Sequence, residues 1–167
     1  MHNIRVPRVL VAISGGAAVG MFYLVGRFDD MYHWPHLFDD PRFISWKRFG
    51  RGPVMDINFL VDGIFKKQAP HLEEEVSRMP TKRFVAGTRF PDNSVHWFHR
   101  EPLYEQLRAT KTMPGLSDEH VNIDGTLYAD GCLTVTMEDC VNKAFQEGAE
   151  RVIVIDNSLC GRHIASY

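Results

Sequence analysis

The chain has 167 residues, of which 44% are apolar and 24% charged, so it is long enough to bury one hydrophobic core. We therefore expect a single domain over residues 1–167. The formal net charge of −2 and the absence of a basic stripe exclude nucleic acid as the expected partner. The cysteines, Cys132, Cys140 and Cys160, show no Cys-x-x-Cys spacing, which predicts neither a disulfide framework nor a zinc site and favours a reducing, cytoplasmic compartment.

The first predicted elements are a strand that ends at Ile13 and a helix that begins near Ser14. The segment Val9–Gly26 carries no charge, and its length also suits a membrane anchor or signal region. Small residues at 14–16 interrupt this segment, which favours a buried strand followed by a buried helix. A membrane-anchored protein is retained as an alternative.

The middle of the chain predicts several short elements. The aromatic stretch from Phe28 to Trp46 indicates an irregular, partly buried connection. Apolar residues at helical spacing predict a helix within residues 55–65. We further expect short helices at 71–78 and 103–109, and a hairpin that pairs 82–87 with 95–98 around Pro91-Asp92-Asn93.

The last third predicts a strand, a helix and a second strand. The first strand ends near Tyr128, and the helix covers residues 137–147, with Thr136 and Asp139 as a capping box and Gly148 as its stop. The apolar run Val152–Ile155 predicts a strand covered on both faces. These elements predict one helix-to-strand step onto a parallel sheet.

Ser14 is the first candidate for chemistry. A strand that leads directly into Ser14-Gly15-Gly16 and a helix is typical of a turn that exposes a nucleophilic serine near a helix N-terminus. The structural alternative is a helix N-cap, for which serine is equally suited. The chain also contains Asp130-Gly131, in which Asp130 could serve as the proton acceptor of Ser14 or simply as a turn residue.

Several stretches together resemble the patatin-like phospholipases, especially their bacterial branch. Ala12-x-Ser14-x-Gly16 resembles the G-x-S-x-G elbow, residues 107–114 resemble the R-A-S-x-A-x-P segment, and Asp130-Gly131-Cys132 resembles the D-G-G or D-G-A motif. The resemblance implies a three-layer α/β/α sandwich with a mostly parallel sheet. It also implies a lipid acyl ester hydrolase with Ser14 as the nucleophile and Asp130 as its partner, acting through an acyl-enzyme without cofactor or metal. Gly15 and Gly16 would then form the elbow and oxyanion site, and Gly131 would support the aspartate motif.

The chain departs from this family before the elbow. The family places a first strand and a Gly-rich oxyanion loop of the G-G-G-x-[KR]-G type there, whereas only thirteen residues precede Ser14. We therefore expect a domain shortened at its N-terminus, which lacks that strand and loop. The functional alternative is a catalytically impaired domain that serves as a binding or scaffold unit. The expected partners are a lipid or other acyl-ester substrate and, at the periphery, a membrane surface.

The sequence is open to three further interpretations. Residues 14–20 could themselves form the Gly-rich loop, but no other serine has the glycine context of an elbow. Ile13-Ser14-Gly15-Gly16 also resembles the pyrophosphate loop of ATP-using ligases, without that motif's aspartate and second serine. His120 and His163 are candidates for a catalytic triad, although their sequence surroundings distinguish neither.

Overall fold

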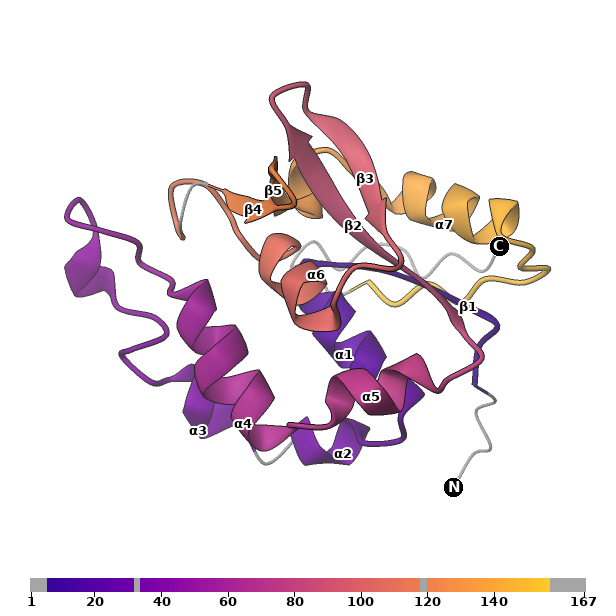
Figure 1. Ribbon diagram of the computed structural model, residues 1–167, viewed down its shortest axis with the longest axis horizontal. Helices are drawn as coiled ribbons and strands as arrows, with labels where there is room; N and C mark the ends of the chain where they lie inside the picture. Colours follow the sequence, from indigo (N-terminus) through magenta and orange to yellow (C-terminus); the bar gives the residue numbers. More distant parts are fainter. Residues whose placement is uncertain (1–5, 32–33, 118–119, 157–167) are drawn as a thin grey trace.

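A computed structural model describes residues 6–31, 34–117 and 120–156. Cys160 and His163 lie outside these residues. The fold is α/β, with a five-stranded mixed sheet and helices on both of its faces (Figure 1).

The central strand of the sheet is β2, to which three other strands pair. The strands are β1 (Val9–Ile13), β2 (Lys82–Phe90), β3 (Ser94–Phe98), β4 (Val121–Ile123) and β5 (Thr126–Asp130). Only β1 and β2 pair in parallel among the described strands, so the prediction of a mostly parallel sheet is wrong. The reason is local, because β2–β3 and β4–β5 are hairpins with short connections, which force antiparallel pairing. The β4–β5 turn uses the left-handed residues Asp124 (φ 49°) and Gly125 (φ 83°).

Two strands share one edge of β2. Residues 85 and 86 of β2 pair with both β1 and β3, so β1 and β3 lie on opposite edges. Residues 87–89 pair with both β3 and β5, so β5 also lies opposite β3. β1 therefore occupies the edge at residues 82–86 and β5 continues it at residues 87–90. Because β5 runs antiparallel to β2, the carboxyl ends of β1 and β5 meet.

The helices are mostly short. They are α1 (Ser14–Leu24), α2 (Phe28–Met31), α3 (Pro35–Phe38), α4 (Lys66–Gln68), α5 (Leu72–Ser77), α6 (Leu103–Ala109) and α7 (Met137–Gln146), with 3₁₀ turns at Trp46–Arg48 and Gly131–Leu133. A π-helical stretch, Phe59–Phe65, leads directly into α4. Its buried residues include the apolar positions that predicted a helix here, so that prediction is confirmed.

The main core lies between the sheet and α1, α6 and the π-helical stretch. Phe22 on α1 is fully buried, with its ring edge-on to Trp34 at 5.0 Å and its centroid 6.5 Å from that of Phe65. Val85 on β2 joins this core, whereas its neighbour Phe84 points to the other face, because side chains alternate along a strand. There the Lys143 ammonium of α7 lies 4.2 Å from the centroid of the Phe84 ring, so α7 covers the second face.

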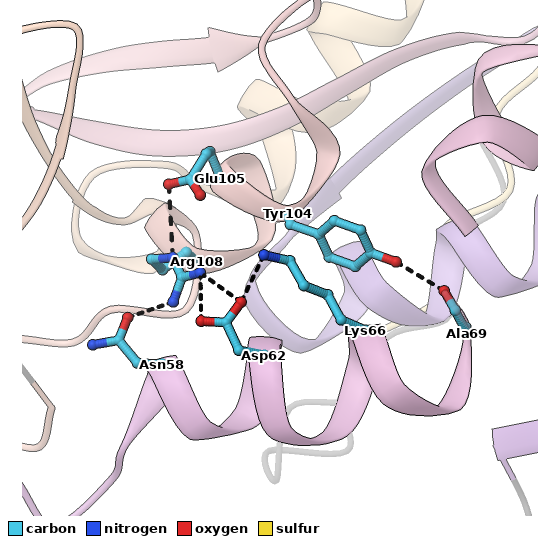
Figure 2. Close-up of polar contacts among 7 residues, drawn as sticks. All are labelled: Asn58, Asp62, Lys66, Ala69, Tyr104, Glu105 and Arg108. Atoms are coloured by element: carbon cyan, nitrogen blue, oxygen red, sulfur yellow. Dashed lines mark hydrogen bonds and ion pairs between the residues drawn. The ribbon is translucent and has the colours of Figure 1, made fainter. Parts of the chain in front are cut away.

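A polar network joins α6 to the helix that includes residues 59–68 (Figure 2). The Arg108 guanidinium of α6 binds both Asn58 and Asp62, and Asp62 also pairs with Lys66 at 2.6 Å. The Tyr104 hydroxyl donates to the Ala69 carbonyl at 2.8 Å. These contacts fix α6 in place, and the residues directly after α6 form part of the site described below.

Most of the predicted elements are present. The structure confirms the strand and helix on either side of Ile13–Ser14, the helices near 71–78 and 103–109, the β2–β3 hairpin and the capped helix after Thr136. The stretch between Phe28 and Trp46 contains two short helices among irregular residues, and β4 was not predicted.

The predicted strand at Val152–Ile155 is wrong. Residues 152–156 form neither helix nor strand, and Ile153 and Ile155 are 81% and 88% exposed. An apolar run becomes a strand only where it pairs with a sheet edge, and this run pairs with no described strand. The predicted helix-to-strand step onto a parallel sheet is therefore absent from the described residues.

The uncharged segment at the start of the chain forms β1 and the eleven-residue helix α1. The buried side chains of α1 include Ala17, Met21 and Phe22, which pack inside the protein. Among the residues that the structure describes, no helix is long and apolar enough to span a bilayer.

The capping box of α7 gives a first test. The Thr136 hydroxyl accepts the Asp139 N–H, and the Asp139 carboxylate accepts the Thr136 N–H at 2.8 Å. Thr136→Ala should lower the free energy of unfolding by about 1 kcal/mol, because helix N–H groups lose their acceptor. Urea unfolding measures the change, with Glu138→Ala in the same turn as the control, expected within about 0.5 kcal/mol of wild type. Equal stability of Thr136→Ala and wild type would contradict a capping role.

Candidate functional site

Ser14 lies at the turn between β1 and α1. Its backbone has φ +49°, a left-handed conformation that is rare for a residue with a Cβ. This conformation reverses the chain from strand to helix within one residue, at a cost of about 1–3 kcal/mol. The surrounding fold therefore holds a half-buried serine in a strained turn.

Asp130 lies at the end of β5, where β5 meets β1. The residue is 1% exposed, and its Oδ2 accepts the Ser14 hydroxyl at 2.7 Å. Its Oδ1 accepts the Cys132 N–H at 2.9 Å. Both carboxylate oxygens are thus hydrogen-bonded, as a buried carboxylate requires.

The junction of β1 and β5 interrupts the backbone ladder along β2. The Ser14 N–H donates to the Thr110 hydroxyl oxygen at 2.9 Å, and that hydroxyl donates to the Ala86 carbonyl at 2.6 Å. Thr110 directly follows α6, so one side chain satisfies both the backbone N–H of Ser14, directly after β1, and the backbone carbonyl of Ala86 on β2. Thr110 therefore fixes the backbone of Ser14 relative to β2.

Similar contacts hold the backbone of Asp130. Its N–H donates to the Thr112 carbonyl at 2.7 Å, and its carbonyl accepts the Thr88 hydroxyl at 2.8 Å. Thr110 and Thr112 come from one short segment after α6. That segment therefore positions both Ser14 and Asp130.

Glycine is required at one of the predicted site positions and not at two others. A Cβ on Gly131 would lie 2.7 Å from the Ala86 carbonyl oxygen, which is backbone and cannot rotate away. A Cβ on Gly15 or Gly16 would meet nothing within 4 Å. The backbone directly after β5 thus approaches β2 closely at Gly131, whereas the start of α1 faces open space.

This difference gives a matched pair of variants. Gly131→Ala should lower the free energy of unfolding by about 1–3 kcal/mol, because its methyl group overlaps the β2 backbone. Gly16→Ala should leave stability unchanged or raise it by up to about 1 kcal/mol, because alanine is favoured in a helix. Thermal and urea unfolding of the two variants test this, and a Gly131→Ala protein as stable as wild type would show that the strands are not so close.

Lys111 is a buried cation beside the dyad. Its ammonium donates to the Ser14 carbonyl at 2.7 Å and lies 5.9 Å from the centroid of the Phe65 ring. Burial lowers the pKa of Lys111 to about 8, and the nearby charge of Asp130 opposes that shift. The side chain is therefore charged at neutral pH and loses its proton in the mildly alkaline range.

The Lys111 pKa predicts a pH-dependent stability. Below pH 8 the lysine is charged in both the folded and the unfolded chain, so folding buries a charge. Between about pH 8 and 10.5 only the unfolded chain stays protonated, and the free energy of unfolding rises with pH. Over this pH interval, the free energy of unfolding of wild type should rise on the order of 3 kcal/mol more than that of Lys111→Met.

Urea unfolding at a series of pH values measures this gain. Lys67→Met, which replaces an exposed lysine, is the control. Its free energy of unfolding should differ from that of wild type by the same amount at every pH. If the difference between wild type and Lys111→Met also stays constant with pH, Lys111 is not buried as a charge.

Cys132 also lies at the dyad. Although Cys132 as a whole is exposed, partial burial of its thiol and the negative charge of Asp130 raise the pKa of that thiol to about 11. Because the thiolate is the reactive form of cysteine, the protonated thiol does not compete with Ser14 as a nucleophile at neutral pH.

The structure thus brings together Ser14, Asp130, Gly131 and the start of α1 with Gly15 and Gly16. Four further residues of the site, Thr88, Thr110, Thr112 and Lys111, are not predicted from the sequence. Three of these residues lie within residues 107–114, one of the stretches that resemble the patatin-like family. That resemblance is the feature of the sequence that points to them.

The Ser14 hydroxyl contacts an aspartate and not a histidine. The triad candidate His120 packs its ring edge-on to Phe90, with centroids 4.2 Å apart. Within the described ranges, the His, Cys, Asp and Glu side chains form no group suited to hold a metal ion.

Comparison with known proteins gives a distant similarity. The chain is 25% identical over 127 residues to uncharacterized NTE family proteins of Mycobacterium bovis and Mycobacterium tuberculosis. The match covers 73% of this chain and 34% of each relative, so the chain spans about a third of the length of these curated proteins. No family model matches the chain. The NTE family is patatin-like, so the similarity supports the resemblance at the level of the family.

Proposed function

We propose that this chain hydrolyses acyl esters of lipids through a Ser14–Asp130 dyad. The observation that carries the proposal is the 2.7 Å hydrogen bond from the Ser14 hydroxyl to the buried Asp130 carboxylate. A serine hydroxyl needs a base to become a nucleophile, and Asp130 is the acceptor in contact with it. The distant similarity to NTE family proteins supports the same class of reaction.

The proposed reaction has two steps. Asp130 accepts the Ser14 proton while Oγ attacks the ester carbonyl carbon, and the tetrahedral intermediate then collapses to an acyl-enzyme. The ester C–O bond breaks, and the alcohol leaves with the proton from Asp130. Water next loses a proton to Asp130 and attacks the acyl group, which releases the fatty acid and returns the proton to Ser14.

The negative charge of the intermediate also needs hydrogen-bond donors. We assign this role to the backbone amides at Gly15 and Gly16, because N–H groups in the first turn of a helix lack acceptors within that helix. The open space beside both glycines leaves room for the substrate carbonyl. The Lys111 ammonium, bound to the Ser14 carbonyl, adds positive charge to the same region.

A fluorophosphonate probe tests the dyad. Wild type should be labelled, and mass spectrometry should place the adduct on Ser14. Ser14→Ala should abolish labelling and turnover of p-nitrophenyl esters, and Asp130→Asn should lower both about 100-fold or more, because an amide does not accept the proton. Ser77→Ala, at an exposed residue of α5 away from the site, should behave as wild type.

Two results would contradict the proposal. Unchanged labelling of Ser14→Ala would remove Ser14 from the mechanism. Absence of labelling in a wild-type protein with cooperative unfolding would instead favour the alternative, a binding or scaffold domain that keeps the geometry without activity.

A further inference from the structure

Two large aromatic side chains are exposed on one loop. Trp46 and Phe49 are each 69% exposed, and their ring centroids lie 6.5 Å apart. Residues 46–52, here called the aromatic tip, belong to the loop that extends furthest to the left in Figure 1, away from the sheet. Aromatic side chains of this size are normally buried, so a pair of them at one exposed place indicates an interaction surface.

The loop that carries the aromatic tip is well anchored at its base. Ile44 and Met55 form an antiparallel bridge, and the buried side chains of Phe43 and Val54 hold the two arms of the loop. The Arg48 guanidinium donates to the carbonyls of Arg42, Phe43 and Val54 at 2.9–3.1 Å. The fold therefore presents Trp46 and Phe49 on a fixed support, and their exposure is a property of the folded loop.

The aromatic tip carries three basic residues, Lys47, Arg48 and Arg51, and no acidic one, whereas Asp39, Asp40 and Asp56 flank its loop. Residues 41–55 contain four basic residues and no aspartate or glutamate, in a chain whose formal net charge is −2. Lys47 and Arg51 are exposed and form no ion pair with a described residue. The nearest acidic residue before the segment, Asp40, is paired with Arg42 at 2.6 Å. Cations beside exposed aromatic side chains match the headgroup region of an anionic bilayer, where tryptophan is enriched and lysine and arginine contact phosphates.

We propose that the aromatic tip docks this protein on the surface of anionic lipid bilayers. Trp46 and Phe49 enter the interfacial layer, and Lys47 and Arg51 contact the lipid phosphates. The inference deepens the proposed function, on which it rests for its biological purpose, because a lipid substrate must be reached at a membrane surface.

Vesicle binding tests the proposal separately from hydrolysis. The full chain with Ser14→Ala is mixed with phosphatidylcholine vesicles that contain or lack 30% phosphatidylglycerol, and binding is measured by flotation. We expect binding to the anionic vesicles that weakens with salt, and little binding to phosphatidylcholine alone. Lys47→Glu with Arg51→Glu should weaken binding about 30-fold or more, since each basic residue near the surface contributes about fivefold.

Two further pairs of substitutions separate the role of the aromatic tip from that of charge elsewhere on the protein. Trp46→Ser with Phe49→Ser should likewise weaken binding to the anionic vesicles, whereas Lys67→Glu with Arg151→Glu, a charge reversal elsewhere, should weaken it far less. Brominated lipids should quench tryptophan fluorescence in the Ser14→Ala background and not when Trp46→Phe is added. Thermal unfolding checks that each variant is folded.

Three results would overturn the proposal: no binding to anionic vesicles, undiminished binding by the aromatic tip variants, or self-association that depends on the aromatic tip without vesicle binding. The last result would assign the loop to a protein contact. Vesicle binding without esterase activity would refute the proposed function alone, and esterase activity without vesicle binding would refute this inference alone.

Discussion

The site depends on one constraint in the sheet: β1 and β5 share a single edge of β2 and meet at their carboxyl ends. Ser14, which follows β1, and Asp130, the last residue of β5, are 116 positions apart in sequence and yet form a hydrogen bond. Interrupting a ladder leaves backbone polar groups that must be satisfied, because a buried unpaired group costs about 1–3 kcal/mol. The segment Thr110–Thr112 after α6 supplies those partners, so the position of α6 controls the geometry of the dyad.

Three features of this junction would each, without a compensating contact, lower the stability of the fold. Ser14 has a left-handed backbone, Asp130 is a buried carboxylate and Lys111 is a buried ammonium. Each has a local compensation: Thr110 holds the Ser14 amide, two donors satisfy the Asp130 oxygens, and the Ser14 carbonyl accepts a hydrogen bond from the Lys111 ammonium. Strain and buried charge that are gathered at one place and compensated there are typical of a site kept for chemistry.

The sequence predicted the parts of the site that local patterns encode. An apolar run that ends at Ser14-Gly15-Gly16 indicated the strand-to-helix turn, and Asp130-Gly131 after a second strand indicated the carboxylate. The pairing direction of the strands was predicted wrongly, and Val152–Ile155 was assigned to a strand, because hydrophobicity does not specify which edge a strand meets. Lys111 was missed for a related reason, since a lysine is expected at the surface and only tertiary packing buries it.

The contact between Ser14 and Asp130 is most directly tested by a crystal structure at a resolution that separates the oxygens of the two side chains. We predict that the Ser14 hydroxyl and the Asp130 carboxylate lie about 2.7 Å apart, with β1 and β5 end to end along β2. Side chains separated beyond hydrogen-bond distance, or strands on opposite edges of β2, would contradict the dyad and the function proposed from it.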